Sequence, residues 1–223
     1  MQHLPFFLLA GIPLLLAPRA QAQSTFSFGP QAGANLSTLH YPQYAAFSSA
    51  GTSRLGLEAG GVVAWQHRHW GFQSGLSFSQ QGAANHARPY TNVAESIDYR
   101  FNYLRLPLSV TYAVRSTGLG FQVFAGPYLS LLVGGSRSYR SGNQTTTMRV
   151  HAGDSNGYNT QVLDTGLQGG LGYRTAHLLF QASGSFGLRN LSAEPNEWDA
   201  QYYSRGVRVS VAYLFGAQSL TGQ

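Results

Sequence analysis

Eight stretches of the chain alternate between apolar and polar residues with a period of two. Successive side chains of a β-strand point to opposite faces, so this period predicts strands with one apolar and one polar face. In the last stretch, Val207, Val209 and Val211 alternate with Arg208 and Ser210. The predicted strands span residues 25–37, 54–66, 70–80, 97–114, 121–133, 163–173, 177–188 and 205–215.

Residues 97–114 form the longest stretch, and its apolar positions change phase once. They fall on odd numbers up to Tyr103 and on even numbers from Leu104 onward. An extra residue exchanges the two faces of a strand, so the phase change predicts a β-bulge. Pro107 follows it, and proline in a paired strand occurs mainly at edges and bulges. We therefore expect Asp98 and Arg105 to share the polar face.

The connections between the stretches alternate in length. Three are short (67–69, 115–120 and 174–176) and four are long (38–53, 81–96, 134–162 and 189–204). Tight periplasmic turns and extended outer loops are typical of outer-membrane barrels. Tilted strands of about 11 residues also suffice to cross a bilayer. The sequence therefore predicts an all-β fold, an eight-stranded antiparallel up-and-down transmembrane β-barrel in the outer membrane of a Gram-negative bacterium.

Aromatic residues flank the short connections on the apolar face. Such residues form a girdle at the membrane interface of transmembrane barrels. The predicted girdle comprises Trp65, Trp70, Tyr112, Phe121, Tyr173 and Phe215.

A soluble, secreted, lipocalin-like barrel that binds a small molecule is the main alternative. Such a ligand cup would turn its bulky apolar side chains inward and its charges outward. An eight-stranded barrel is only wide enough inside for side chains to fill it. The glycine- and serine-rich polar face fits that narrow interior better, which favours the transmembrane barrel.

The beginning of the chain resembles a secretory signal. Residues 4–17 are largely apolar, and Ala20-Gln21-Ala22 fits the small-x-small pattern that signal peptidase accepts. A membrane anchor is the alternative, but the run is short for a spanning helix. We therefore expect residues 1–22 to be a signal peptide and residues 23–223 to be one barrel domain.

The amino-acid composition limits the classes of molecule that the protein is expected to bind. The chain has no cysteine, and all 14 of its Lys and Arg residues are arginine, which gives a net charge of +6. A basic surface favours anionic lipid and the phosphates of lipopolysaccharide. The arginines are scattered rather than clustered, which argues against nucleic acid as a partner.

Charged residues on the predicted polar faces would be enclosed by the barrel. An isolated charge in such an interior is costly, so opposite charges there are expected to pair. We interpret these residues as a structural network that fills the lumen, with a gated ion path or proton relay as the alternative. The residues are Arg54, Glu58, Asp98, Arg100, Arg105, Asp164 and Arg208.

Signals for metal or cofactor chemistry are weak, and we expect neither group. His67 and His69 share a face but lie in a predicted turn, where solvation is the simpler interpretation. The segment DSNG at 154–157 lacks the downstream glutamate of a calcium loop. A lipid A-modifying enzyme is a further alternative, with His40, His86 and His151 in outer loops. No base lies beside a nucleophile in the sequence pattern, so we predict a protein without enzymatic activity.

Four short motifs resemble those of the PorT-type outer-membrane β-barrel proteins of Bacteroidetes. They are GPQAGANLS at 29–37, YLRLPL at 103–108, AGPY at 125–128 and VAYLF at 211–215. The resemblance covers essentially the whole mature chain and implies an outer-membrane location. Tyr213 and Phe215 also resemble the aromatic C-terminal signal read by the barrel-assembly machinery, although eight residues follow Phe215.

The long loops are where we expect function. Residues 134–162 contain three arginines, and residues 189–204 combine acidic residues with Trp198, Tyr202 and Tyr203. Exposed aromatic side chains beside charges suit contact with a partner or a saccharide. We therefore predict a monomeric barrel with a largely occluded lumen, whose outer loops contact an envelope protein or simply cover the barrel mouth.

Overall fold

The computed structural model describes residues 24–40, 51–86, 95–141, 144–150, 161–192 and 201–216. Within them the chain forms nine strands, and no helix there is long and apolar enough to cross a bilayer. The predicted signal peptide at 1–22 lies outside the described residues. The strands are β1 (Ser24–His40), β2 (Gly51–His67), β3 (Trp70–His86), β4 (Glu95–Ala113), β5 (Gly120–Ser141), β6 (Gln144–Val150), β7 (Leu163–Arg174), β8 (Leu178–Gly187) and β9 (Tyr203–Tyr213).

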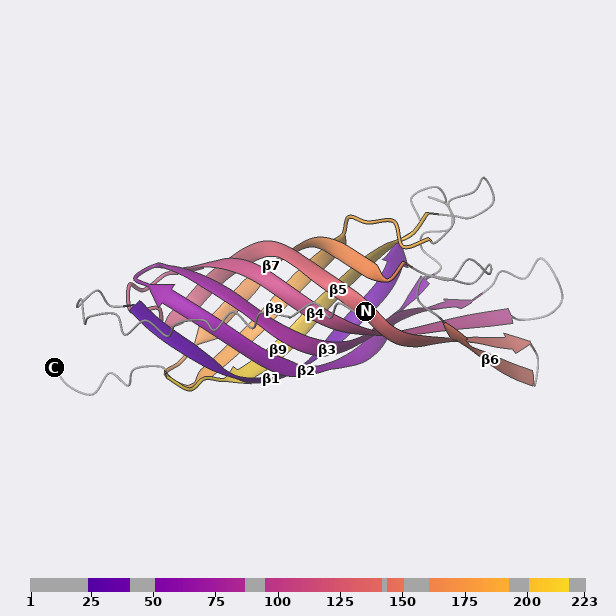
Figure 1. The fold of residues 1–223 in the computed structure, drawn as a ribbon, viewed down its shortest axis with the longest axis horizontal. Helices are drawn as coiled ribbons and strands as arrows, with labels where there is room; N and C mark the ends of the chain where they lie inside the picture. The colour runs from indigo at the N-terminus through magenta and orange to yellow at the C-terminus, as the bar shows by residue number, and fades with distance from the viewer. Residues whose placement is uncertain are drawn as a thin grey trace, which may run out of the picture.

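Eight of these strands close into an antiparallel barrel, as predicted (Figure 1). Their order is β4-β3-β2-β1-β9-β8-β7-β5, and pairing of β4 with β5 completes the ring. Closure leaves the eight strands of the ring without an unpaired edge within the described residues, which is the condition for placing strands in a bilayer. The ninth strand, β6, pairs only with β5.

The two ends of the barrel differ. The connections β2–β3, β4–β5 and β7–β8 are short and lie together at the left in Figure 1, whereas the β5–β6 hairpin projects at the right. This arrangement agrees with short periplasmic turns and long outer connections. About half of the predicted outer loops, including residues 41–50, 87–94, 151–160 and 193–200, lies outside the described residues.

Part of the predicted loop at 134–162 is in fact a hairpin. Strand β5 continues to Ser141, and β6 pairs back onto it with Ser138 opposite Thr147. Residues 134–150 are mostly polar or glycine in sequence, so the segment lacks the regular apolar alternation that predicts the other strands. Its threonines at 145–147 favour extended backbone without revealing a buried face.

The apolar faces point away from the barrel axis. Leu55, Trp70 and Phe121 are each at least 60% exposed, whereas Glu58 and Arg105 are 5% and 3% exposed. Every strand of the ring carries large exposed apolar side chains on this outer face. A lipocalin-like cup requires the opposite arrangement, so the soluble alternative does not fit the fold.

Strand β4 does not exchange its faces, and that prediction is wrong. Phe101, Tyr103 and Arg105 are all buried on the inner side, so one register runs through the predicted slip. A register shift does occur there, but the extra residue, Val133, belongs to β5. The sequence pattern changes because the surroundings change. Beyond the apolar belt the outer face of β4 becomes polar, and its inner face packs into an apolar cluster.

Candidate functional site

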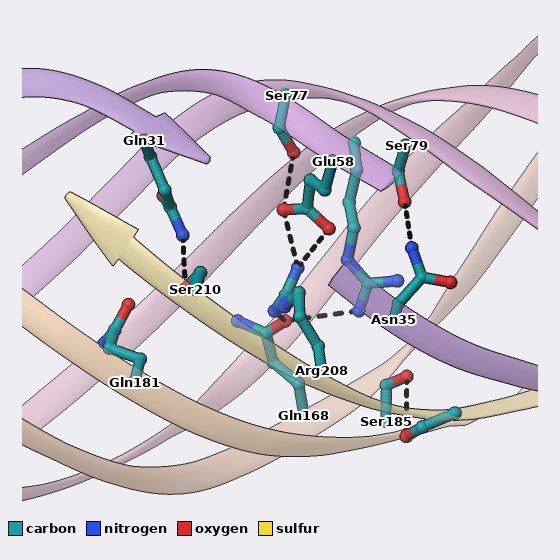
Figure 2. Close-up of polar contacts among 12 residues, drawn as sticks. Gln31, Asn35, Glu58, Ser77, Ser79, Gln168, Gln181, Ser185, Arg208 and Ser210 are labelled. Carbon is teal, nitrogen blue, oxygen red and sulfur yellow. Dashed lines mark hydrogen bonds and ion pairs between the residues drawn. The ribbon is translucent and has the colours of Figure 1, made fainter. Parts of the chain in front are cut away.

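The barrel interior is filled by polar side chains from all eight strands of the ring. Glu58 lies at its centre, and its carboxylate accepts hydrogen bonds from Arg208 at 3.1 and 3.3 Å and from Ser77 at 3.0 Å. These residues come from β2, β9 and β3, so one carboxylate connects three parts of the wall. Figure 2 shows Arg208 between Glu58 and Gln168.

Gln168 on β7 extends this network to the other side of the lumen. Its side-chain oxygen accepts hydrogen bonds from Arg208 at 2.8 Å and from Arg105 at 3.2 Å. Its amide nitrogen donates to Ser109 at 3.0 Å. Gln168 therefore joins β9 to β4 across the barrel, and the network runs from wall to wall.

A second group of polar contacts lies nearer the outer end. The Arg105 guanidinium carbon lies 3.7 Å from the centre of the Tyr128 ring. The Tyr128 hydroxyl and Ser204 both donate to one oxygen of Asp164, at 3.3 and 2.7 Å. Asp164 is fully buried, and its charge faces Arg105 across the tyrosine. The two groups therefore share Arg105.

An apolar cluster closes the mouth above these contacts. It consists of Leu39, Ala83, Phe101, Tyr103, Leu132 and Leu191. Leu191 follows β8 and is 1% exposed, and its backbone nitrogen donates to Tyr202 at 3.0 Å. The segment after β8 is thus anchored inside the mouth.

Three of the seven predicted lumen residues lie elsewhere. Asp98 and Arg100 alternate with the inward-facing Tyr99 and Phe101, and they therefore point to the outer face of β4. Arg54 and Arg100 both pair with Asp98 there, and the Arg100 side chain is 62% exposed. The other four, Glu58, Arg105, Asp164 and Arg208, lie in the lumen.

Several lumen residues were not singled out from the sequence. Gln168 has no signal beyond its place on a polar face, and Ser204 lies in the predicted connection 189–204. Arg174 lies in the predicted connection 174–176, but in the structure it ends β7, is buried, and donates to the Ser27 hydroxyl at 2.9 Å. A tyrosine among the small residues of a polar face, as at Tyr128, was the one available signal.

The predicted girdle residues all lie outward near the short connections. Trp65, Trp70, Tyr112, Phe121, Tyr173 and Phe215 are each more than 40% exposed. Several form edge-to-face pairs with ring centres 5.0 Å apart: Trp70 with Tyr112, Phe121 with Tyr173, and Tyr213 with Phe215. The first two pairs join neighbouring strands, so the rings form a band around this end.

The described residues contain no group of three His, Cys, Asp or Glu side chains placed to hold a metal. His67 stacks on Trp65, and His69 stacks on Tyr112 and contacts the Ala113 carbonyl oxygen at 2.9 Å. Both histidines therefore contribute to the turn. The half-buried Ser204 does donate a hydrogen bond to the buried Asp164, but the described lumen contacts include no histidine that could act as a base toward the serine.

These features define a closed eight-stranded barrel of the outer membrane, with apolar side chains facing lipid and charges enclosed. The chain belongs to the outer membrane protein beta-barrel domain family, whose model matches residues 20–193. No curated protein matches the sequence.

Solved structures of outer-membrane barrels are similar in fold. Neisserial surface protein A is 14% identical, with a TM-score of 0.46 and coverage of 86% of this chain and 99% of that one. Ail, the attachment invasion locus protein of Yersinia pestis, solved with the heparin analogue sucrose octasulfate, is 10% identical, with a TM-score of 0.43 and the same coverage. The N-terminal barrel of Pseudomonas aeruginosa OprF is 12% identical, with a TM-score of 0.34 and coverage of 83% and 97%.

Proposed function

We propose that this protein is a non-catalytic, non-conducting barrel that acts through its extracellular end. The observation that carries the proposal is the polar network from Glu58 through Arg208 and Gln168 to Arg105, which crosses the lumen. The cavity left beside these residues measures about 20 Å³. That volume holds about one water molecule, too little for a continuous aqueous path.

The apolar cluster at the mouth supports the same conclusion. A solute would have to displace Leu191, Phe101 and Leu132 before reaching the charged network. Both layers are contributed by strands or by residues adjoining them, so opening the lumen requires the loss of packed contacts. The role therefore falls to the surface: the outer wall, the β5–β6 hairpin and the outer loops.

Conductance across a planar bilayer tests the closed lumen. We expect no unitary steps from the wild-type barrel. A variant with Tyr128→Ala, Gln168→Ala and Arg208→Ala should show small steps, because it lacks the side chains that span the interior. Steady porin-like conductance of the wild type would contradict the proposal.

Other assignments complete the proposal. The motifs at 29–37 and 103–108 support a PorT-type member of the family, with residues 1–22 as its signal peptide. The aromatic residues near the short connections serve as the periplasmic interfacial girdle. The barrel is a monomer assembled by the barrel-assembly machinery, and its outer loops contact envelope components.

A further inference from the structure

A groove of about 770 Å³ lies on the outer wall beside the β5–β6 hairpin. Its lining includes three arginines, Arg54, Arg100 and Arg149, together with the amide side chains Gln80 and Asn102. The lumen network described above contains none of these residues.

Strand register places these side chains on the outer face. Arg100 pairs with Ser136 of β5, and Ser136 pairs with Arg149 of β6, so the three residues form one row across the sheet. Asn102 pairs with Gln80 of β3 in the next row toward the membrane. Paired residues point to the same side, and Arg100 is on the outer side.

Arg54 reaches this face across a glycine. A Cβ atom at Gly82 would lie 2.8 Å from the Arg54 Cδ atom, so the side chain of Arg54 passes directly over Gly82. Gly82 pairs with Arg100, and both therefore face outward. Among the described residues, one carboxylate, Asp98, pairs with Arg54 and Arg100. Three arginines against this one aspartate leave the groove with net positive charge.

The groove adjoins the lipid-facing surface. Leu55 and Val133 also line it and are 65% and 49% exposed. Leu104 and Leu131 continue the exposed apolar surface toward the short-turn end. The groove therefore lies where hydrocarbon gives way to polar head groups at the outer leaflet. Within the described residues, no ion pair joins Arg149 to a carboxylate.

We propose that this groove binds the phosphorylated sugar head group of a glycolipid in the outer leaflet. Arginine offers planar, paired donors suited to phosphate, and it remains charged at all relevant pH values. Gln80 and Asn102 can bond sugar hydroxyls, while Leu55 and Val133 contact the beginning of the acyl chains. The inference rests on the proposed outward orientation of this end, but it is independent of the closed lumen.

Lipid binding to the full-length barrel in detergent tests the proposal. The probes are bisphosphorylated lipid A and the same lipid after removal of its phosphates, and native mass spectrometry counts the bound molecules. We expect one equivalent of the phosphorylated lipid to bind selectively. Loss of Arg54, Arg100 and Arg149 by substitution with Gln should weaken this binding by about tenfold or more, since each exposed ion pair contributes modestly.

Two controls keep the result interpretable. The double variant R100Q/R149Q changes only exposed side chains and should retain the fold, as judged by heat-modifiable gel mobility, while still losing selectivity. Arg115→Gln removes an exposed arginine at the periplasmic end and should bind lipid as the wild type does.

Three outcomes would overturn the inference: equal binding of both lipids, undiminished binding by the triple variant, or displacement by equimolar inorganic phosphate. The last would assign the groove to a soluble phosphate compound. Failure here leaves the conductance result unchanged, whereas a conducting lumen would leave selective lipid binding intact. The two proposals therefore fail separately.

Discussion

Glu58 is 5% exposed, and it is the only carboxylate that contacts Arg208 in the described structure. The contribution of Glu58 to stability depends on its partners, because a charge removed from water is compensated only by hydrogen bonds and opposite charge. Removing one partner of such a pair leaves the other charged and enclosed. Removing both is less damaging.

Glu58→Ala is therefore expected to lower the free energy of unfolding by about 2–3 kcal/mol. Arg208 keeps its bond to Gln168 but loses its counter-charge, and Ser77 loses its acceptor. The measurement is equilibrium unfolding by guanidinium of the barrel folded into phospholipid vesicles.

The matched variants are Glu58→Gln, which retains an acceptor, and the double variant E58A/R208A. Both should be less destabilised than Glu58→Ala alone. A stability for Glu58→Ala within about 0.5 kcal/mol of wild type, the range of ordinary surface substitutions, would show that the pair does not hold the wall together.

The alternation of polar and apolar residues along each strand was sufficient to place Glu58, Asp164 and Arg208 on the inner face. It could not identify their partners, because contacts across a lumen depend on which strands face one another. Gln168 became central only once β7 was positioned between β9 and β4 in the ring. Tyr128 became central only once the neighbouring strands β4 and β7 placed Arg105 and Asp164 beside it. Asp98 and Arg100 were misplaced for a different reason, which lies at the scale of the strand.

Strand β4 passes through two environments. Its apolar residues face outward in the first, within the bilayer, and inward in the second, beyond the bilayer. Within the bilayer, Leu104 and Val110 face lipid while Arg105 and Ser109 face the lumen. Beyond it, Arg100 faces water while Phe101 plugs the mouth. When both faces of a strand reverse their polarity, the apolar positions change phase in the sequence. A bulge that exchanges the two faces produces the same change of phase. Only strand pairing distinguishes the two, and it places the extra residue in β5.

The β5–β6 hairpin extends past the ring, and within the described structure β6 pairs with β5 alone. A two-stranded extension without a buried apolar face contributes little stability of its own. It does hold Arg149 in one row with Ser136 and Arg100, so its contribution is to the outer groove.

Shortening the hairpin should therefore leave the barrel intact. In the variant, residues 138–147 are replaced by Asn-Gly, a favoured two-residue turn that joins Arg137 to Met148, which are already paired. We expect heat-modifiable gel mobility to persist and the free energy of unfolding to change by less than about 1 kcal/mol. A barrel that no longer folds would show that the hairpin is part of the closed core.

At the scale of the whole molecule, closure joins the two ends of the described chain. β1 pairs with β9 from Gln31 opposite Ala212 onward, and an isolated bridge joins Phe28 to Phe215. Gly29 lies between these two sets of pairs. The alternation of short and long connections predicted a closed ring, but the tight approach of the strands at this seam depends on backbone positions that a polarity pattern does not contain.

Gly29→Ala should therefore weaken closure. A Cβ atom at Gly29 would overlap the backbone oxygen of Tyr213, so β1 and β9 must separate locally. The free energy of unfolding is expected to fall by at least about 1 kcal/mol, the range for overpacking a tight site, with a smaller heat-modifiable fraction after refolding.

Gly61→Ala is the matched control, because its Cβ would meet only the Gly29 oxygen at 3.7 Å, an ordinary contact. That variant should be neutral or slightly stabilised, since alanine restricts the unfolded chain. Equal stability of the two variants would mean that the seam tolerates a side chain, and closure would then depend on the lumen network instead.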